Sequence, residues 1–258
     1  MKDKVVIVTG STAGIGLGIA KAFAESGANV VVNGRNLEKL EEACSRLEAF
    51  GDRILALRGD AANETDIQRI VKVAKSRFGR IDVLVNNAAT TGVGTTVAEM
   101  QTEIWDSVLN TNLRGVFLFS KAVIPHLVEN QSGRIINIGG LSAKNPTPFT
   151  AADAASKAGL LALTRVLAAE LGMQNVTVNT VIPGFQPDTE TGQKFNDNLA
   201  EAFHAAPDSL ITTTQSRTLL KRFETVEEIA QTVLFLASDA GAAITGQHIN
   251  VNCGLATY

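Results

Sequence analysis

The feature that most constrains this chain is a glycine-rich turn near its start. It follows the apolar run 5–8 and has the spacing Gly-x3-Gly-x-Gly. Glycine allows a tight turn and a close backbone approach to phosphate, and a helix N-terminus stabilises the negative charge. A triplet of this kind between a strand and a helix is typical of a dinucleotide site. We therefore predict coenzyme contacts from Gly10, Ser11, Thr12, Gly14, Ile15 and Gly16.

Short apolar runs alternate with helical patterns along the rest of the chain. Several runs are continuously apolar, as strands buried on both faces of a sheet are. The predicted strands are 4–9, 29–33, 53–58, 82–86, 134–139, 176–182 and 248–252. The predicted helices are 14–26, 36–50, 64–78, 99–130 with a break, 152–173 and 225–237. This order predicts a single-domain Rossmann-type α/β fold over 1–258, a doubly wound parallel sheet of about seven strands with helices on both faces.

One segment, 184–222, interrupts the alternation. It contains Pro187, Gly192 and Pro207 and is too long for an ordinary connection. It follows the carboxyl end of a predicted strand, where open α/β sheets bind ligands. We name it the lid segment and predict that it covers the substrate. The alternative is a surface insertion with no role in binding.

Composition argues against several classes of function. With Lys+Arg 23 and Asp+Glu 26 the net charge is −3, so nothing indicates a nucleic-acid or membrane surface. No apolar run approaches membrane-spanning length and no signal-peptide pattern precedes the first strand, so we expect a cytoplasmic protein. Cys44 and Cys253 lie far apart and in no CxxC motif. They indicate neither a metal site nor a disulfide.

The glycine spacing, with Thr9 ahead of it, resembles that of the short-chain dehydrogenase/reductase family, and the resemblance extends over essentially the whole chain. Further matching residues are Asp60-Ala61, Asn86-Asn87-Ala88, Asn112, Lys157 and Pro183-Gly184. The resemblance implies an oxidoreductase that acts on a small-molecule substrate. It also implies association as a homo-dimer or homo-tetramer through the helices at about 102–130 and 152–173.

The resemblance also implies how the coenzyme is held. Asp60 would bind the adenine amino group with Ala61 beside it, Asn86 would line the nicotinamide ribose, and Lys157 would hold the ribose hydroxyls. The family pattern completes the coenzyme site with Ala88, Pro183 and Gly184.

The choice between NADP and NAD depends on the end of the second strand. An NAD site usually has a carboxylate there for the ribose 2′-OH, and Gly34 removes it. Arg35 could bind a 2′-phosphate bidentately. Ala13, by contrast, lacks the basic group that many NADP-binding members carry inside the glycine turn. We predict NADP as the preferred coenzyme, with NAD as the alternative.

Two of the family's four catalytic positions differ here. The family uses Asn, Ser, Tyr and Lys, and the tyrosine, four residues before the lysine, exchanges the proton at the substrate oxygen. In this chain Asp153 stands at the tyrosine position and Gly140 at the serine position, while Asn112 and Lys157 remain. The single tyrosine is Tyr258. A carboxylate beside a lysine stays ionised and cannot donate a proton to a ketone.

Substitutes for the missing groups lie nearby in the sequence. Ser142 follows Gly140 by two residues, and in extended backbone it would point the same way. The predicted catalytic set is therefore Asn112, Ser142, Asp153 and Lys157. Weaker candidates for a hydroxyl or an acid are Thr147, Thr150 and His204. Asp153 could instead simply pair with Lys157.

Three functions remain open. The leading one is an atypical NAD(P)(H)-dependent oxidoreductase for a small carbonyl or enoyl substrate. The sequence at 86–89 is locally similar to that of the 2,4-dienoyl-CoA reductases of the family, which need no such tyrosine. The second is a catalytically silent partner or regulatory subunit, in a hetero-oligomer with an active homologue. The third is redox-neutral elimination or dehydration with Asp153 as the base. A further departure from the family pattern is the stretch Asn252-Cys253-Gly254, which replaces an acidic–glycine pair.

Overall fold

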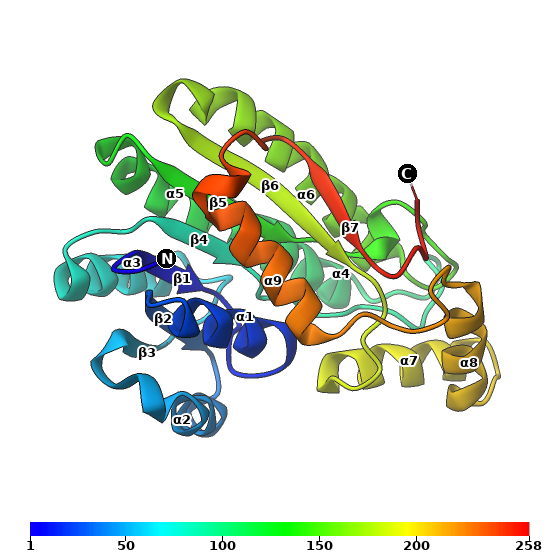
Figure 1. Ribbon diagram of the computed structural model, residues 1–258. Helices are drawn as coiled ribbons and strands as arrows, with labels where there is room; N and C mark the ends of the chain where they lie inside the picture. Colours follow the sequence, from blue (N-terminus) through cyan, green and yellow to red (C-terminus); the bar gives the residue numbers. More distant parts are fainter. Residues whose placement is uncertain (258) are drawn as a thin grey trace.

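A seven-stranded parallel sheet lies between two layers of helices in the computed structural model, which describes residues 1–257 (Figure 1). The strands are β1 (Val5–Val8), β2 (Asn29–Gly34), β3 (Ile54–Arg58), β4 (Val83–Asn86), β5 (Gly133–Ile138), β6 (Val176–Pro183) and β7 (His248–Val251). Their order is β3-β2-β1-β4-β5-β6-β7, so the direction of winding reverses between β1 and β4. The predicted fold class is confirmed.

The helices follow the predicted alternation. They are α1 (Gly14–Glu25), α2 (Leu37–Arg46), α3 (Glu64–Phe78), α4 (Thr102–Leu109), α5 (Gly115–Glu129), α6 (Ala151–Leu171), α7 (Glu190–Ala202), α8 (Pro207–Arg217) and α9 (Val226–Ala237). The predicted helix 36–50 is too long, since α2 ends at Arg46 and a 3₁₀ turn follows in which Gly51 has φ 54°. The break in 99–130 is a π-helical turn, Asn110–Arg114, between α4 and α5.

The core lies on both faces of the sheet. Successive strand residues point to opposite faces. Val6 and Val8 of β1 pack in the layer of α1, α2 and α9, whereas Ile7 packs in the layer of α3, α5 and α6. Both faces are therefore apolar, which explains why the strands have continuously apolar sequences.

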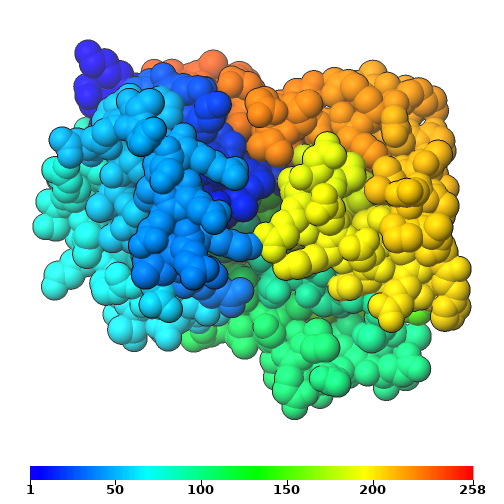
Figure 2. Space-filling view, turned by 90° about the horizontal axis from the view of Figure 1, so that it is seen from below, coloured from blue at the N-terminus to red at the C-terminus, as the bar shows by residue number. Residues whose placement is uncertain are grey.

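The helices of the lid segment stand apart from these layers. Helices α7 and α8 lie beyond the carboxyl end of β6 (Figure 1). Seen from that side, α7 (yellow) lies beside α2 (blue) (Figure 2). The carboxyl edge of the sheet therefore faces the lid segment. Within residues 1–257, none of the helices has both the length and the apolar character needed to cross a membrane.

Candidate active site

A cavity of about 950 Å³ lies at the carboxyl ends of the strands. Its walls come from the glycine turn, the segments after β4 and β5, the start of α6 and the lid segment. Open α/β sheets bind ligands at the point where the winding reverses. The cavity therefore joins most of the predicted coenzyme residues to three of the predicted catalytic residues, Ser142, Asp153 and Lys157.

The glycine turn has the geometry of a phosphate cradle. Gly10 and Gly14 have φ 59° and 51°, the left-handed region that favours glycine. A β-carbon on Gly10 would lie 2.7 Å from Cα of Ala88. Helix α1 begins at Gly14 without a side-chain cap and without an acidic residue in its first turn. Its first N–H groups are available to an anion, so these residues fit the diphosphate of a dinucleotide.

Thr9 joins the glycine turn to the segment after β4. Its Oγ1 accepts hydrogen bonds from the backbone N of Asn87 at 3.0 Å and of Ala88 at 2.9 Å. Nδ2 of Asn87 donates to the backbone O of Thr9 and of Gly10, both at 2.9 Å. The two sides of the cavity floor are therefore fixed to each other.

Two predicted coenzyme residues lie behind the cavity wall. Ser11 is fully buried and its Oγ donates to the backbone O of Val8 at 2.7 Å. Asn86 is buried as well, and its Nδ2 donates to Oδ1 of Asn137 at 2.9 Å. Neither Ser11 nor Asn86 is among the described residues that line the cavity. Both side chains form hydrogen bonds that fix the ends of β1 and β4, so a direct contact of either one with a coenzyme stays a prediction.

The predicted adenine end carries a group of arginines. Arg35 forms an ion pair with Asp60 at 3.6 Å, and Nε of Arg58 donates to the backbone O of Arg35 at 3.0 Å. A recess of about 400 Å³ beside them is lined by Arg35, Arg58, Gly59, Asp60, Asp66 and Arg69. A β-carbon on Gly34 would overlap the methyl group of Thr12. The site therefore offers cations, and position 34 has no room for a carboxylate unless Thr12 moves.

The predicted asparagine sits in the π-helical turn between α4 and α5. Oδ1 of Asn112 accepts from the backbone N of Thr90 at 2.8 Å, and its Nδ2 donates to Thr90 O at 2.9 Å and to Ser156 Oγ at 3.2 Å. Such turns occur often at functional sites. Within the described chain Asn112 is not part of the cavity lining. It fixes the wall at Thr90.

Lys157 and Asp153 are both in the cavity wall, on α6. Burial lowers the pKa of Lys157, and the charge of Asp153 raises it by a smaller amount. Nζ of Lys157 donates to the backbone O of Ile138 at 3.0 Å. In the part of the chain that the structure describes, Lys157 and Asp153 form no direct ion pair. Lys157 donates to a strand end, and the charge of Asp153 acts on it without a direct contact between the two side chains.

Asp153 accepts a hydrogen bond from Ser142. The serine Oγ donates to Oδ2 of Asp153 at 2.5 Å. The backbone at Leu141–Ala143 is a 3₁₀ turn, not the extended chain that we predicted, because the N of Ala143 donates to Gly140 O at 3.1 Å. The Ser142 hydroxyl nevertheless lies close to Gly140. A β-carbon on Gly140 would lie 3.6 Å from it.

Of the three weaker catalytic candidates, two line the cavity and one does not. Thr147 and Thr150 line the cavity, with Thr150 Oγ1 donating to Thr147 O at 2.7 Å. His204, at the end of α7, is outside the cavity lining given by residues 1–257. Tyr258 lies outside the described residues. Within those residues, no group of three or more His, Cys, Asp or Glu side chains is placed to hold a metal ion.

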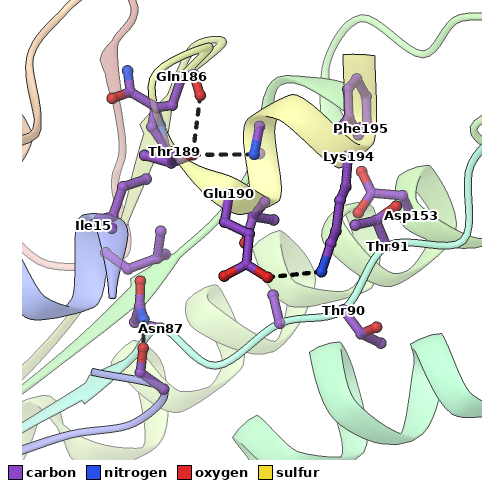
Figure 3. Close-up of a pocket in the computed structure, with 18 of the residues that line it drawn as sticks. Ile15, Asn87, Thr90, Thr91, Asp153, Gln186, Thr189, Glu190, Lys194 and Phe195 are labelled. Carbon is purple, nitrogen blue, oxygen red and sulfur yellow. Dashed lines mark hydrogen bonds and ion pairs between the residues drawn. The ribbon is translucent and has the colours of Figure 1, made fainter. Parts of the chain in front are cut away.

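Sequence reasoning missed a bridge across the mouth of the cavity. Glu190 of α7 accepts from Lys194 one turn later at 2.8 Å and from Lys39 of α2 at 2.5 Å. These two lysines, Lys194 first, lower the pKa of Glu190 to about 2. Figure 3 shows Glu190 and Lys194 in the cavity with Thr90 and Asp153. The Glu-x3-Lys spacing was a visible signal, but it is typical of any solvated helix surface.

The sheet order and the glycine turn at its switch point define a Rossmann-type dinucleotide-binding protein. Residues 10–256 match the family model described as enoyl-(acyl carrier protein) reductase. The chain belongs to the short-chain dehydrogenase/reductase family, which confirms the family resemblance of its motifs.

Similar proteins are reductases and dehydrogenases of nearly equal length. A 3-oxoacyl-(acyl-carrier-protein) reductase of Thermotoga maritima is 34% identical over 99% of this chain and 98% of its own. Subunit BbsD of the (2S)-((R)-hydroxy(phenyl)methyl)succinyl-CoA dehydrogenase of Thauera aromatica is 37% identical, covering 98% of this chain and 96% of that one. The crystal structure of an actinorhodin polyketide ketoreductase with NADPH has a TM-score of 0.94 at 33% identity and covers 99% and 98% of the two chains.

Proposed function

We propose that this protein is an NADP(H)-dependent oxidoreductase that acts on a small carbonyl or enoyl substrate without a tyrosine proton donor. The observation that carries the proposal is the single cavity that joins the glycine turn at Gly10 to Asp153 and Lys157. Hydride transfer needs the coenzyme and the substrate side by side in one site, shielded from water. The reductase relatives and the NADPH-bound structural neighbour support the same class of reaction.

The substrate side of the cavity is apolar. The lid segment contributes a set of large apolar side chains to the lining: Phe185, Phe195, Leu199, Phe203 and Leu210. Apolar pockets with a few polar groups bind apolar ligands and exclude water. We infer that 184–222 is a substrate-covering lid and that the substrate carries an apolar acyl or aryl group.

Bound NADP(H) would donate or accept the hydride at the substrate carbon. The chain's own residues handle the proton at the substrate oxygen. In the oxidation direction a substrate hydroxyl gives its proton to Ser142, which passes its own proton to Asp153 along their 2.5 Å hydrogen bond. In the reduction direction the Ser142 hydroxyl, held by its hydrogen bond to Asp153, gives its proton to the substrate oxygen and takes one back from solvent. The Ser142 hydroxyl thus takes the place of the one missing at Gly140.

Removing either end of this path should slow turnover and leave coenzyme binding intact. We expect Ser142→Ala and Asp153→Asn to lower kcat about 10²-fold or more, the usual size of a general acid–base contribution. The NADPH dissociation constant should stay within about threefold of the wild type, because neither side chain holds the diphosphate. The measurement is a nicotinamide-fluorescence titration with NADPH and NADH, then turnover on a panel of ketones, enones and enoyl thioesters.

The matched control is Asp208→Asn, an exposed carboxylate on α8 outside the cavity lining. It should behave as the wild type. Failure of the wild-type protein to bind either coenzyme would sink the oxidoreductase proposal. Full activity in Asp153→Asn would remove Asp153 from the proton path.

The arginines at the adenine end predict the coenzyme. Arg35→Ala should weaken NADPH binding by about 10- to 100-fold, the loss expected for a charge-assisted hydrogen bond. NADH binding should change by less than about threefold, because NADH has no 2′-phosphate. Arg46→Ala, an exposed arginine at the far end of α2, is the control. An equal loss for both coenzymes would contradict the preference for NADP and point to a structural role of Arg35.

The second candidate is a subunit of a larger enzyme, with little chemistry of its own. The relative from Thauera aromatica is itself named as a dehydrogenase subunit. Phe117 of α5 and Val166 of α6 are 47% and 52% exposed. Large exposed apolar side chains on these two helices fit an interface with a second copy or a homologue. Coenzyme binding without turnover, together with co-purification of an active homologue, would favour this candidate.

A further inference from the structure

The two ends of the lid segment meet at one buried carboxylate. Glu224, which is 5% exposed, lies just after the segment, and its Oε1 accepts from the backbone N of Gly184 at 2.6 Å. Nε2 of Gln186 donates to the same oxygen at 2.8 Å and to Glu224 O at 3.0 Å. The rings of Phe185 and Phe223 pack edge to face with centroids 5.5 Å apart. Hydrogen bonds and a ring contact therefore hold the start of the lid segment against the residues that follow its end.

The Glu224 carboxylate is held in place by hydrogen bonds to one of its oxygens. Burial raises the pKa of Glu224 above its usual range, and the hydrogen bonds from its own backbone, from Gly184 and from Gln186 offset only part of that rise. A β-carbon on Gly184 would lie 2.9 Å from Cβ of Asn252 and 3.0 Å from each Glu224 oxygen. Oε2 of Glu224 and Nδ2 of Asn252 are buried and have no hydrogen-bond partner within residues 1–257. Since an unsatisfied buried charge is costly, the bonds through Oε1 are the ones that keep the carboxylate in place.

A continuous path leads from Glu224 to the glycine turn. The backbone O of Gln186 accepts from Thr189 N at 3.2 Å and from Thr189 Oγ1 at 3.0 Å. Oγ1 of Thr189 in turn accepts from Gly192 N at 3.0 Å and caps α7 (Figure 3). A β-carbon on Gly14 would lie 3.5 Å from the side chain of Thr189. The path therefore ends directly over the start of α1.

We propose that Glu224 is a positioning residue for coenzyme binding. By fixing Gly184 and Gln186 it keeps Thr189 and the first turn of α7 docked over the glycine turn. The coenzyme would lie against this wall, so the position of the wall sets its affinity. The inference rests on the proposed function, since it requires a coenzyme in the cavity.

Three variants test the proposal. Glu224→Ala removes the acceptor, Glu224→Gln keeps Oε1, and Glu227→Ala removes an exposed carboxylate three residues away. The readouts are the NADPH dissociation constant from fluorescence, the rate of limited proteolysis within 184–222 located by mass spectrometry, and the melting temperature. We expect Glu224→Ala to weaken NADPH binding and to speed cleavage, each by about tenfold, because two buried donors lose their acceptor. Glu224→Gln should rescue both to within about threefold, and Glu227→Ala should match the wild type.

The outcomes separate positioning from bulk stability and from the proposed function. Wild-type NADPH affinity and wild-type cleavage in Glu224→Ala, with only a lower melting temperature, would overturn the positioning role alone. A wild-type protein that binds no coenzyme would overturn the coenzyme function and this role within it. Should Glu224→Ala fail to fold, Gln186→Ala interrupts the same path one step later and carries the same expectations.

Discussion

Gly16→Ala should abolish coenzyme binding, with an NADPH dissociation constant raised about 100-fold or more. A β-carbon on Gly16 would overlap Nδ2 of Asn87 and the backbone O of Gly10, and it would lie 2.9 Å from Cα of Ser11. Nδ2 of Asn87 and the backbone O of Gly10 form the 2.9 Å hydrogen bond that fixes the cavity floor. Overpacking of a tight site costs about 1–3 kcal/mol, so some loss of stability should accompany the loss of binding. Fluorescence titration and thermal unfolding measure the two effects.

Gly172→Ala is the matched control for this change. Gly172 follows α6 with φ −58°, and a β-carbon there would have no heavy atom within 4 Å. The variant should bind NADPH as the wild type does. Unchanged affinity in Gly16→Ala would show that the coenzyme does not lie on this turn.

Gly140→Ser combined with Asp153→Tyr should raise NADPH-dependent ketone reduction about 10²-fold or more, since a phenol can donate the proton that a carboxylate cannot. The site has room for the change. A β-carbon on Gly140 would make ordinary contacts, 3.5 Å to Cγ of Lys157 and 3.6 Å to Oγ of Ser142. Asp153 already faces the cavity, so a longer side chain there can extend into it.

The control for the double variant is Gly140→Ala with Asp153→Phe, which adds similar volume without hydroxyl groups. Each single substitution should gain little, because catalytic residues that act as a unit are not additive. Steady-state reduction of a panel of ketones measures all four proteins. No gain in the Ser/Tyr variant would indicate that Asn112 and Lys157 are no longer arranged for catalysis, which would favour the subunit candidate.

Local sequence patterns were enough to predict the fold class. Strands buried on both faces need only apolar residues such as those of β1, and these are visible in the sequence itself. The errors occurred where the backbone changes conformation within an element. The predicted helix 36–50 is too long because α2 ends at Arg46 and a 3₁₀ turn follows, with Gly51 at positive φ just beyond the predicted range. The predicted break in 99–130 is a π-helical turn, whose extra residue no pattern marks.

The candidate site was predictable in part. Spacing placed Gly10 and Asp153 at the sheet edge, because residues at strand ends and helix starts converge there in this fold. Spacing could not show that the side chains of Asn86 and Ser11 form hydrogen bonds behind the cavity wall, since packing decides their partners. Nor did it predict that Lys157 would bond the backbone of Ile138 instead of Asp153.

The sequence by itself determined the parallel sheet, the glycine turn and the absence of a tyrosine before Lys157, because each depends on residue type and short-range spacing. Only the tertiary structure decided which distant groups meet. Ser142 reaches Asp153 across 11 residues, Glu224 reaches Gly184 across 40, and Lys39 reaches Glu190 across 151. Contacts at such separations depend on how the layers pack, and their geometry has no signature in the local sequence.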